Sequence, residues 1–150
     1  MKTALLEKIR LELRAQFDRL SKAALDAHAA ATDPGSKAES KYDTRSLEAS
    51  YLASGQARQV AAIAEASRIF ESLSLPDFDP EDAVEAGALV EIDRSGESEW
   101  FLLAPAAGGL EIEHQGLAIT LLTPESQLYG KLLGTHVGDS MDDLIVTEVL

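Results

Sequence analysis

The chain has 150 residues, 45% of them apolar and 26% charged, which suits one ordinary globular domain or two small units. Thirteen basic residues face 26 acidic ones, and the net charge of −13 argues against binding to duplex DNA and against direct sequence-specific recognition of nucleic acid, which needs a basic surface. The lack of cysteine excludes disulfides, cysteine-based zinc sites and thiol catalysis. No apolar run reaches the ~18 residues of a membrane span, and charged residues come too early for a secretory signal. We therefore expect a cytoplasmic protein with no membrane partner.

The first half of the chain has the pattern of two long helices. Over residues 4–31, apolar side chains recur at alternating steps of three and four, as in a coiled coil. This stripe consists of Leu6, Ile9, Leu13, Gln16, Leu20, Ala23, Ala27 and Ala30. A second helix with a weaker stripe is predicted over residues 44–74. Because the turn signal Pro34-Gly35 lies between them, we predict an antiparallel helical hairpin with an exposed loop at its tip.

The charge changes abruptly where this helical pattern ends. Residues 1–75 hold 11 basic and 10 acidic side chains, whereas residues 76–150 hold two basic and 16 acidic ones, a net charge of −14. Pro76 and Pro80 stand at the change, and prolines end helices. We therefore predict two domains, 1–75 and 76–150.

The second half has the pattern of a small sheet. Strands are predicted over residues 88–92, 99–103, 110–113, 117–122 and 144–149, with a short helix over 127–133. Residues 93–97 are predicted to form a hairpin loop, and Gly134 to mark the end of the short helix. Strands accompanied by one late helix indicate an α+β domain.

Three carboxylates stand close together in the loop between the two predicted helices: Asp33, Glu39 and Asp43. In one interpretation the loop is simply solvated, and Asp43 or Thr44 caps the second helix. In the second interpretation, the helical rod carries the carboxylates into the cavity of another protein. There they would add oxygen ligands to a bound Mg²⁺ that activates a water for phosphoryl chemistry.

One contiguous segment, Thr123–Asp139, carries the elements Thr-Pro, Leu-Leu-Gly and Val-Gly-Asp in this order. This segment, called the signature segment below, resembles a motif of the GreA/GreB transcription elongation factors. The stretch from Trp100 to Leu110 is similar to a strand and turn of some divergent members. The resemblance implies a helical hairpin (a coiled coil) followed by a small FKBP-like α+β domain.

The resemblance also implies a partner and an activity. In this family the C-terminal domain docks at the rim of the secondary channel of bacterial RNA polymerase. The hairpin presents acidic residues to the Mg²⁺ of the polymerase active site, which then cleaves backtracked RNA. The chain would therefore be no enzyme and have no cofactor of its own, and Glu39 and Asp43 would hold metal only jointly with the polymerase. The docking candidates implied by the signature segment are Pro124, Leu128, Leu132 and His136.

The tip departs from the family pattern Asp-x-x-Glu-Asn-Ala-Glu-Tyr. The nearest match is residues 39–42 (Glu-Ser-Lys-Tyr), and Ser36 stands where the family has an aspartate. Either Asp33 or Asp43 would then have to supply the second carboxylate. Stimulation of cleavage and occupation of the channel without cleavage therefore both stay open. Two functions of different classes also stay open, an interaction module built on the coiled coil and a prolyl isomerase, and we expect a monomer.

Overall fold

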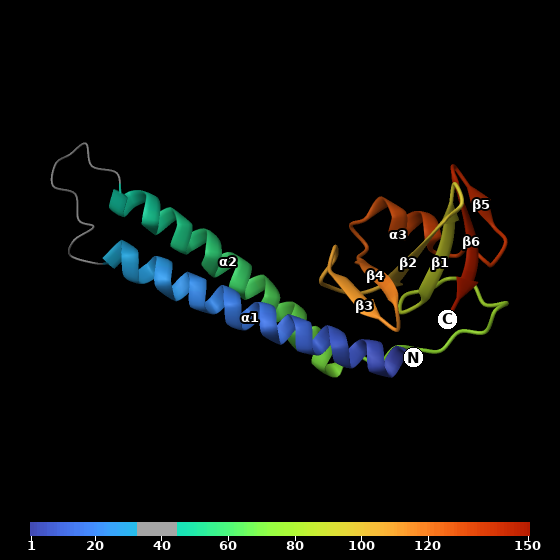
Figure 1. Cartoon of the computed structure of the whole chain (residues 1–150), viewed down its shortest axis with the longest axis horizontal. Coiled ribbons are helices and arrows are strands. Elements are labelled where there is room, and N and C mark those ends of the chain that lie inside the picture. The colour runs from blue at the N-terminus through green and yellow to red at the C-terminus, as the bar shows by residue number, and fades with distance from the viewer. Residues whose placement is uncertain (33–44) are drawn as a thin grey trace. The chain divides into compact units, whose positions relative to one another are not determined.

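The computed structural model describes the backbone of residues 1–32 and 45–150, and the side chains of residues 1–29 and 54–150. Figure 1 shows two long helices followed by a sheet with one short helix. The elements are α1 (Lys2–Thr32), α2 (Arg45–Ser72), β1 (Leu89–Arg94), β2 (Glu97–Leu103), β3 (Glu111–His114), β4 (Leu117–Leu122), α3 (Gln127–Leu132), β5 (Ser140–Met141) and β6 (Leu144–Val149). The predicted class, two long helices followed by a small α+β unit, is confirmed.

The chain divides into two compact units. The sheet unit contains Met1–Ile9 and Ile69–Leu150, and the hairpin unit contains Arg10–Arg68. The first turns of α1 and the last turn of α2 therefore belong to the sheet unit. The predicted division into domains 1–75 and 76–150 is a different partition and stays a prediction.

In the hairpin unit, α1 and α2 lie side by side and run in opposite directions (Figure 1). Burial along α1 follows the predicted stripe and weakens with distance from the N-terminus. Leu6, Ile9 and Leu13 are buried, whereas Gln16, Leu20, Ala23 and Ala27 are half-buried. Ala30 lies outside the described side chains. On α2 the covered positions have the same spacing: Gln56, Val60, Ile63, Ala66 and Phe70.

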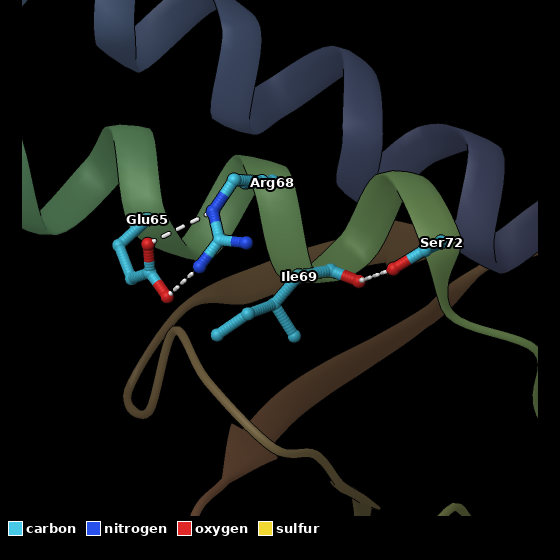
Figure 2. A network of polar contacts seen from close by, with 4 residues as sticks. All are labelled: Glu65, Arg68, Ile69 and Ser72. Atoms are coloured by element: carbon cyan, nitrogen blue, oxygen red, sulfur yellow. Dashed lines mark hydrogen bonds and ion pairs between the residues drawn. The ribbon is translucent and has the colours of Figure 1, made fainter.

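The C-terminal end of α2 comes slightly earlier than predicted. The helix ends at Ser72 rather than 74, because Pro76 disfavours helical backbone at Leu75. Figure 2 shows the polar contacts on this part of α2. The Arg68 guanidinium donates to both carboxylate oxygens of Glu65, over 3.1 and 2.5 Å, and the Ser72 hydroxyl donates to the Ile69 carbonyl over 3.4 Å. Both Glu65 and Arg68 are largely exposed, so this pair adds little to stability.

No helix in the described part of the chain has a stretch long and apolar enough to cross a membrane.

The sheet has six strands in the order β3-β4-β2-β1-β6-β5. Strands β2 and β4 are parallel, and every other neighbouring pair is antiparallel. The loop between β1 and β2 is shorter than the predicted loop 93–97, because β1 continues to Arg94 and β2 begins at Glu97. Only Ser95 and Gly96 make the turn. Both have positive φ, of 57° and 88°, as a two-residue hairpin turn of this hand requires. Strand β5, only two residues long, was not predicted.

One face of the sheet carries a core of aliphatic and aromatic side chains. Its members are Val84, Ala88, Val90, Ile92, Phe101, Leu103, Leu122, Tyr129, Leu132, Leu144, Val146 and Val149. Tyr129 and Leu132 come from α3, so the short helix lies on this face. Because side chains alternate along a strand, the intervening residues face the other side.

The other face of the sheet is buried in part. Leu89, Leu102, Ile119 and Leu121 point to this face and are fully buried, as are Leu5, Ile9 and Phe70 of the helical segments in the same unit. The Lys8 ammonium donates to the Glu113 carbonyl of β3 over 2.8 Å, which fixes the start of α1 beside the sheet edge. The first turns of α1 and the end of α2 therefore add buried apolar side chains to the sheet unit, and these together with the four strand residues are called the second core below.

Candidate docking site

The signature segment begins directly after β4, where Thr123 is held by two neighbours. A Cβ on Gly108 would lie 2.7 Å from the Thr123 hydroxyl oxygen, so the loop from β2 to β3 crosses here with space only for glycine. The Thr123 side chain forms a hydrogen bond with the Glu125 carboxylate, which lowers the pKa of Glu125. Pro124 is exposed between them. This entry to the segment is therefore a fixed turn that presents a proline to solvent.

Two adjacent leucines at the end of α3 point in different directions, one into the core and one toward solvent. Leu132 is fully buried in the core, and Leu128 packs against it. Leu133, the next residue along the chain, is 49% exposed. The Lys131 ammonium contacts the Asp142 carboxylate over 2.7 Å, and this hydrogen bond lowers the pKa of Asp142. The helix is thus tied to the turn between β5 and β6.

The loop after α3 is held from two sides by backbone hydrogen bonds. Gly134 has a φ of +82°, as expected where a helix stops at a glycine. Its N–H donates to the Val84 carbonyl and the Val84 N–H donates to the Thr135 carbonyl, both over 2.7 Å. On the other side, the Val146 N–H donates to the Asp139 carbonyl over 2.9 Å. The Asp139 carboxylate accepts the His136 N–H over 2.8 Å and closes the loop.

The structure separates the four predicted docking residues. Pro124 and His136 are exposed at either end of the segment, and Leu128 is half-buried. Leu132 fills the core, so its side chain supports the segment from within, and its role in docking stays a prediction. The helix α3 has only six residues, which is too short for a periodic pattern of apolar residues. The sequence therefore could not show which of its side chains are buried and which are exposed.

Two exposed apolar residues of the segment were missed. Leu133 is 49% exposed and Val137 is 41% exposed, and both belong to the described residues with unusually exposed large apolar side chains. They flank the loop that Val84 and Asp139 hold in place. The Leu-Leu-Gly and Val-Gly-Asp elements of the sequence contained both of them. The loop therefore presents two apolar side chains to solvent on a strongly acidic unit.

The predicted tip carboxylates Asp33, Glu39 and Asp43 lie outside the described residues. Among the residues that the structure does describe, no group of three or more histidine, aspartate or glutamate side chains is placed to hold a metal ion.

No protein-family model and no curated protein sequence matches the chain. Among solved structures, GreA factor homolog 1 (Gfh1) of Thermus thermophilus is similar, with 18% identity, 94% of each chain covered and a TM-score of 0.38. Gfh1 of Thermus aquaticus is another, with 15% identity, 92% of this chain and 91% of that chain covered, and a TM-score of 0.34. A similarity this distant supports no functional conclusion by itself, so the function has to follow from the chain's own residues.

Proposed function

We propose that the chain is a transcription elongation factor that binds bacterial RNA polymerase and enters its secondary channel with the tip of the helical hairpin. The observation that carries this proposal is the placement of the signature segment. The segment that resembles the GreA/GreB motif forms a fixed loop with an exposed proline, an exposed histidine and two exposed apolar residues. This loop lies among the strands that follow the two long antiparallel helices in the chain, the order that the resemblance implies.

Charge supports a protein partner rather than nucleic acid. Residues 76–150 carry a net charge of −14, whereas residues 1–75 are close to neutral. An acidic docking unit is repelled by the phosphates of DNA and RNA but is attracted to a basic rim on a protein. In this proposal the near-neutral hairpin is the part that approaches the nucleic acid.

The proposal gives the tip a metal-binding role that it exerts only inside the channel. Glu39, with Asp43 or Asp33, would add carboxylate oxygens to the Mg²⁺ of the polymerase, the type of ligand that this ion prefers. The free chain should bind Mg²⁺ poorly, because the ion keeps its waters and the carboxylates are not pre-assembled. Since Ser36 replaces the aspartate of the family pattern, occupation of the channel without cleavage is the second candidate function.

A direct binding assay with purified RNA polymerase tests the docking step. We expect the unmodified chain to bind and Leu133→Ser to weaken binding at least tenfold, because the substitution removes an exposed apolar contact without adding charge. Leu11→Ser is the matched control, since Leu11 is 61% exposed on α1 and outside the signature segment. Equal loss in both variants, or no binding by the unmodified chain, would contradict the proposal.

A cleavage assay on a stalled elongation complex separates the two candidate functions. If the chain stimulates cleavage, Glu39→Ala should reduce the cleavage rate at least tenfold and leave polymerase affinity within twofold. Binding by the unmodified chain without any cleavage would instead favour the regulator that only occupies the channel.

A further inference from the structure

Lys2 is a buried lysine that joins two distant parts of the chain. Its side chain is only 7% exposed. The ammonium donates to the Pro76 carbonyl over 2.5 Å and to the Gly87 carbonyl over 3.0 Å, and lies 4.6 Å from the centre of the Phe78 ring. Burying a lysine is costly, so a lysine at this position has a function that the ordinary core side chains of the unit do not supply.

The two carbonyls that bind Lys2 mark the two ends of one loop. The segment Pro76–Gly87, called the pinched loop below, has its first and last residues in contact with each other. A Cβ on Gly87 would lie 2.7 Å from Pro76 Cδ, and Gly87 has a φ of +90°. Compact loops with touching ends are often functional. Lys2 holds the ends of this loop together with one ammonium group.

The C-terminal part of the pinched loop, close to Gly87, holds the signature segment. Val84 is fully buried in the core of the sheet unit. Its N–H donates to the Thr135 carbonyl and its carbonyl accepts the Gly134 N–H, both over 2.7 Å. A continuous path of contacts therefore runs from Lys2 through the ends of the pinched loop and Val84 to the loop after α3.

We propose that Lys2 is a positioning residue for the signature segment and acts on it through the pinched loop. Without the Lys2 side-chain nitrogen, the ends of the pinched loop separate, Val84 loses its fixed place, and the loop that carries Leu133 and Val137 moves. The consequence for polymerase affinity rests on the function proposed above, whereas the consequence for loop order does not.

Lys2 can serve this role in either protonation state. Burial lowers the pKa of Lys2 to about 8, an effect that the nearby Asp77 carboxylate partly offsets. A neutral amine still has two N–H groups, which is the number that the two carbonyls require. The link between the loop ends therefore depends on the nitrogen and its reach rather than on its charge alone.

Amide hydrogen exchange on the full chain tests the proposal. In Lys2→Met, which keeps the length and loses the donors, we expect the amides of Val84 and Gly134 to exchange at least tenfold faster. Lys8→Met is the matched control, because Lys8 also donates to a backbone carbonyl, that of Glu113, but outside the path. In that variant the same two amides should stay within twofold of the unmodified protein.

A second substitution opens the same loop from its other end. Gly87→Ala places a Cβ against Pro76 and forces an unfavourable φ, while Lys2 stays intact. We expect it to accelerate amide exchange at Val84 and Gly134 as Lys2→Met does. In the double variant, the exchange rates should rise by less than the product of the two single-variant increases, because both substitutions open the same loop. If Lys2→Met fails to fold, amide exchange in Gly87→Ala still tests whether the pinched loop positions the signature segment.

Two results would overturn the positioning role. One is unchanged exchange at Val84 and Gly134 in both variants. The second is a uniform acceleration across β1, β2 and β6, which would mean global loss of stability only. Polymerase affinity is then read separately, with a loss of fivefold or more expected for Lys2→Met. If the unmodified chain binds no polymerase while the exchange pattern holds, the proposed function fails and the positioning role stands.

Discussion

His114 is buried without the partners that a polar side chain needs. It is 5% exposed at the end of β3, on the face of the sheet that also holds Ile119 and Leu121. Neither ring nitrogen finds a hydrogen-bond partner among the residues that the structure describes. A buried polar group without a partner costs about 1–3 kcal/mol, so this imidazole weakens the second core of the sheet unit.

Replacing His114 by an apolar residue should therefore cost nothing and can stabilise the fold. For His114→Leu we expect the free energy of unfolding, from urea denaturation, to stay equal or to rise by about 1 kcal/mol. His136→Leu is the control, since His136 is exposed and its side chain should change stability by less than about 0.5 kcal/mol. A loss of more than about 1 kcal/mol in His114→Leu would show that the imidazole makes a stabilising contact.

Lys2 gives the stability of the chain a specific dependence on pH. Burial lowers its pKa in the folded chain from 10.5 to about 8, so between these pH values the unfolded chain binds more protons than the folded one. This group therefore makes the free energy of unfolding rise as the pH increases from 8 to 10.5.

The matched comparison is with Lys2→Met, which has no titrating group at this position. Urea denaturation at pH values below, within and above the window should show the unmodified protein gaining stability relative to Lys2→Met as the pH rises. A constant difference across the window would contradict a buried, titrating ammonium.

Contacts between residues that are far apart along the chain could not be predicted from the sequence. The two carbonyls that accept hydrogen bonds from Lys2 are 74 and 85 residues away along the chain, so no local sequence pattern predicts these contacts. In the signature segment the motif located the loop, but the burial of Leu132 and the exposure of Leu133 depend on how α3 lies on the core. Side-chain roles of this kind are set by tertiary packing.

The helix α1 offers a matched pair of leucines for testing the hairpin. Leu13 is fully buried on the predicted stripe, whereas Leu11 is 61% exposed two residues earlier. Leu13→Asp should lower the free energy of unfolding by about 3 kcal/mol or more, because it buries an unpaired charge. Leu11→Asp should change it by less than about 0.5 kcal/mol. Thermal unfolding followed by circular dichroism makes the comparison, and similar effects in both variants would contradict the stripe.

Most elements could be predicted because their signals are local. Apolar spacing placed both ends of α1 within two residues, and short apolar runs between turn signals located β1, β2, β3, β4 and β6. Strand β5 was missed because two residues are too short for an alternating pattern, and it exists by pairing with β6. The participation of Leu5 in the sheet unit was also missed, since a helical stripe does not say which surface each turn contacts.

At the scale of the whole molecule, the uneven charge predicts how docking responds to salt. The sheet unit holds the excess of acidic side chains, and the hairpin unit is close to neutral. If the sheet unit docks on a basic surface, polymerase affinity should fall about tenfold or more when salt rises from ~50 to ~300 mM, because exposed charges are then screened. Leu133→Ser should lower affinity while leaving this salt dependence unchanged. An affinity that is independent of salt would mean that apolar contacts alone hold the complex.

The composition of the sheet unit from both Met1–Ile9 and Ile69–Leu150 sets an order on folding during synthesis. Leu5 and Ile9 are made well before the strands of the same unit, and β6 pairs with β1 only after residue 144 has been made. At ~5–20 residues per second, the first turns of α1 wait roughly 7 to 28 s for their core. The two helices can pair during that interval. During synthesis, Leu5 and Ile9 therefore stay without the strands of their unit until the last of these strands has been made.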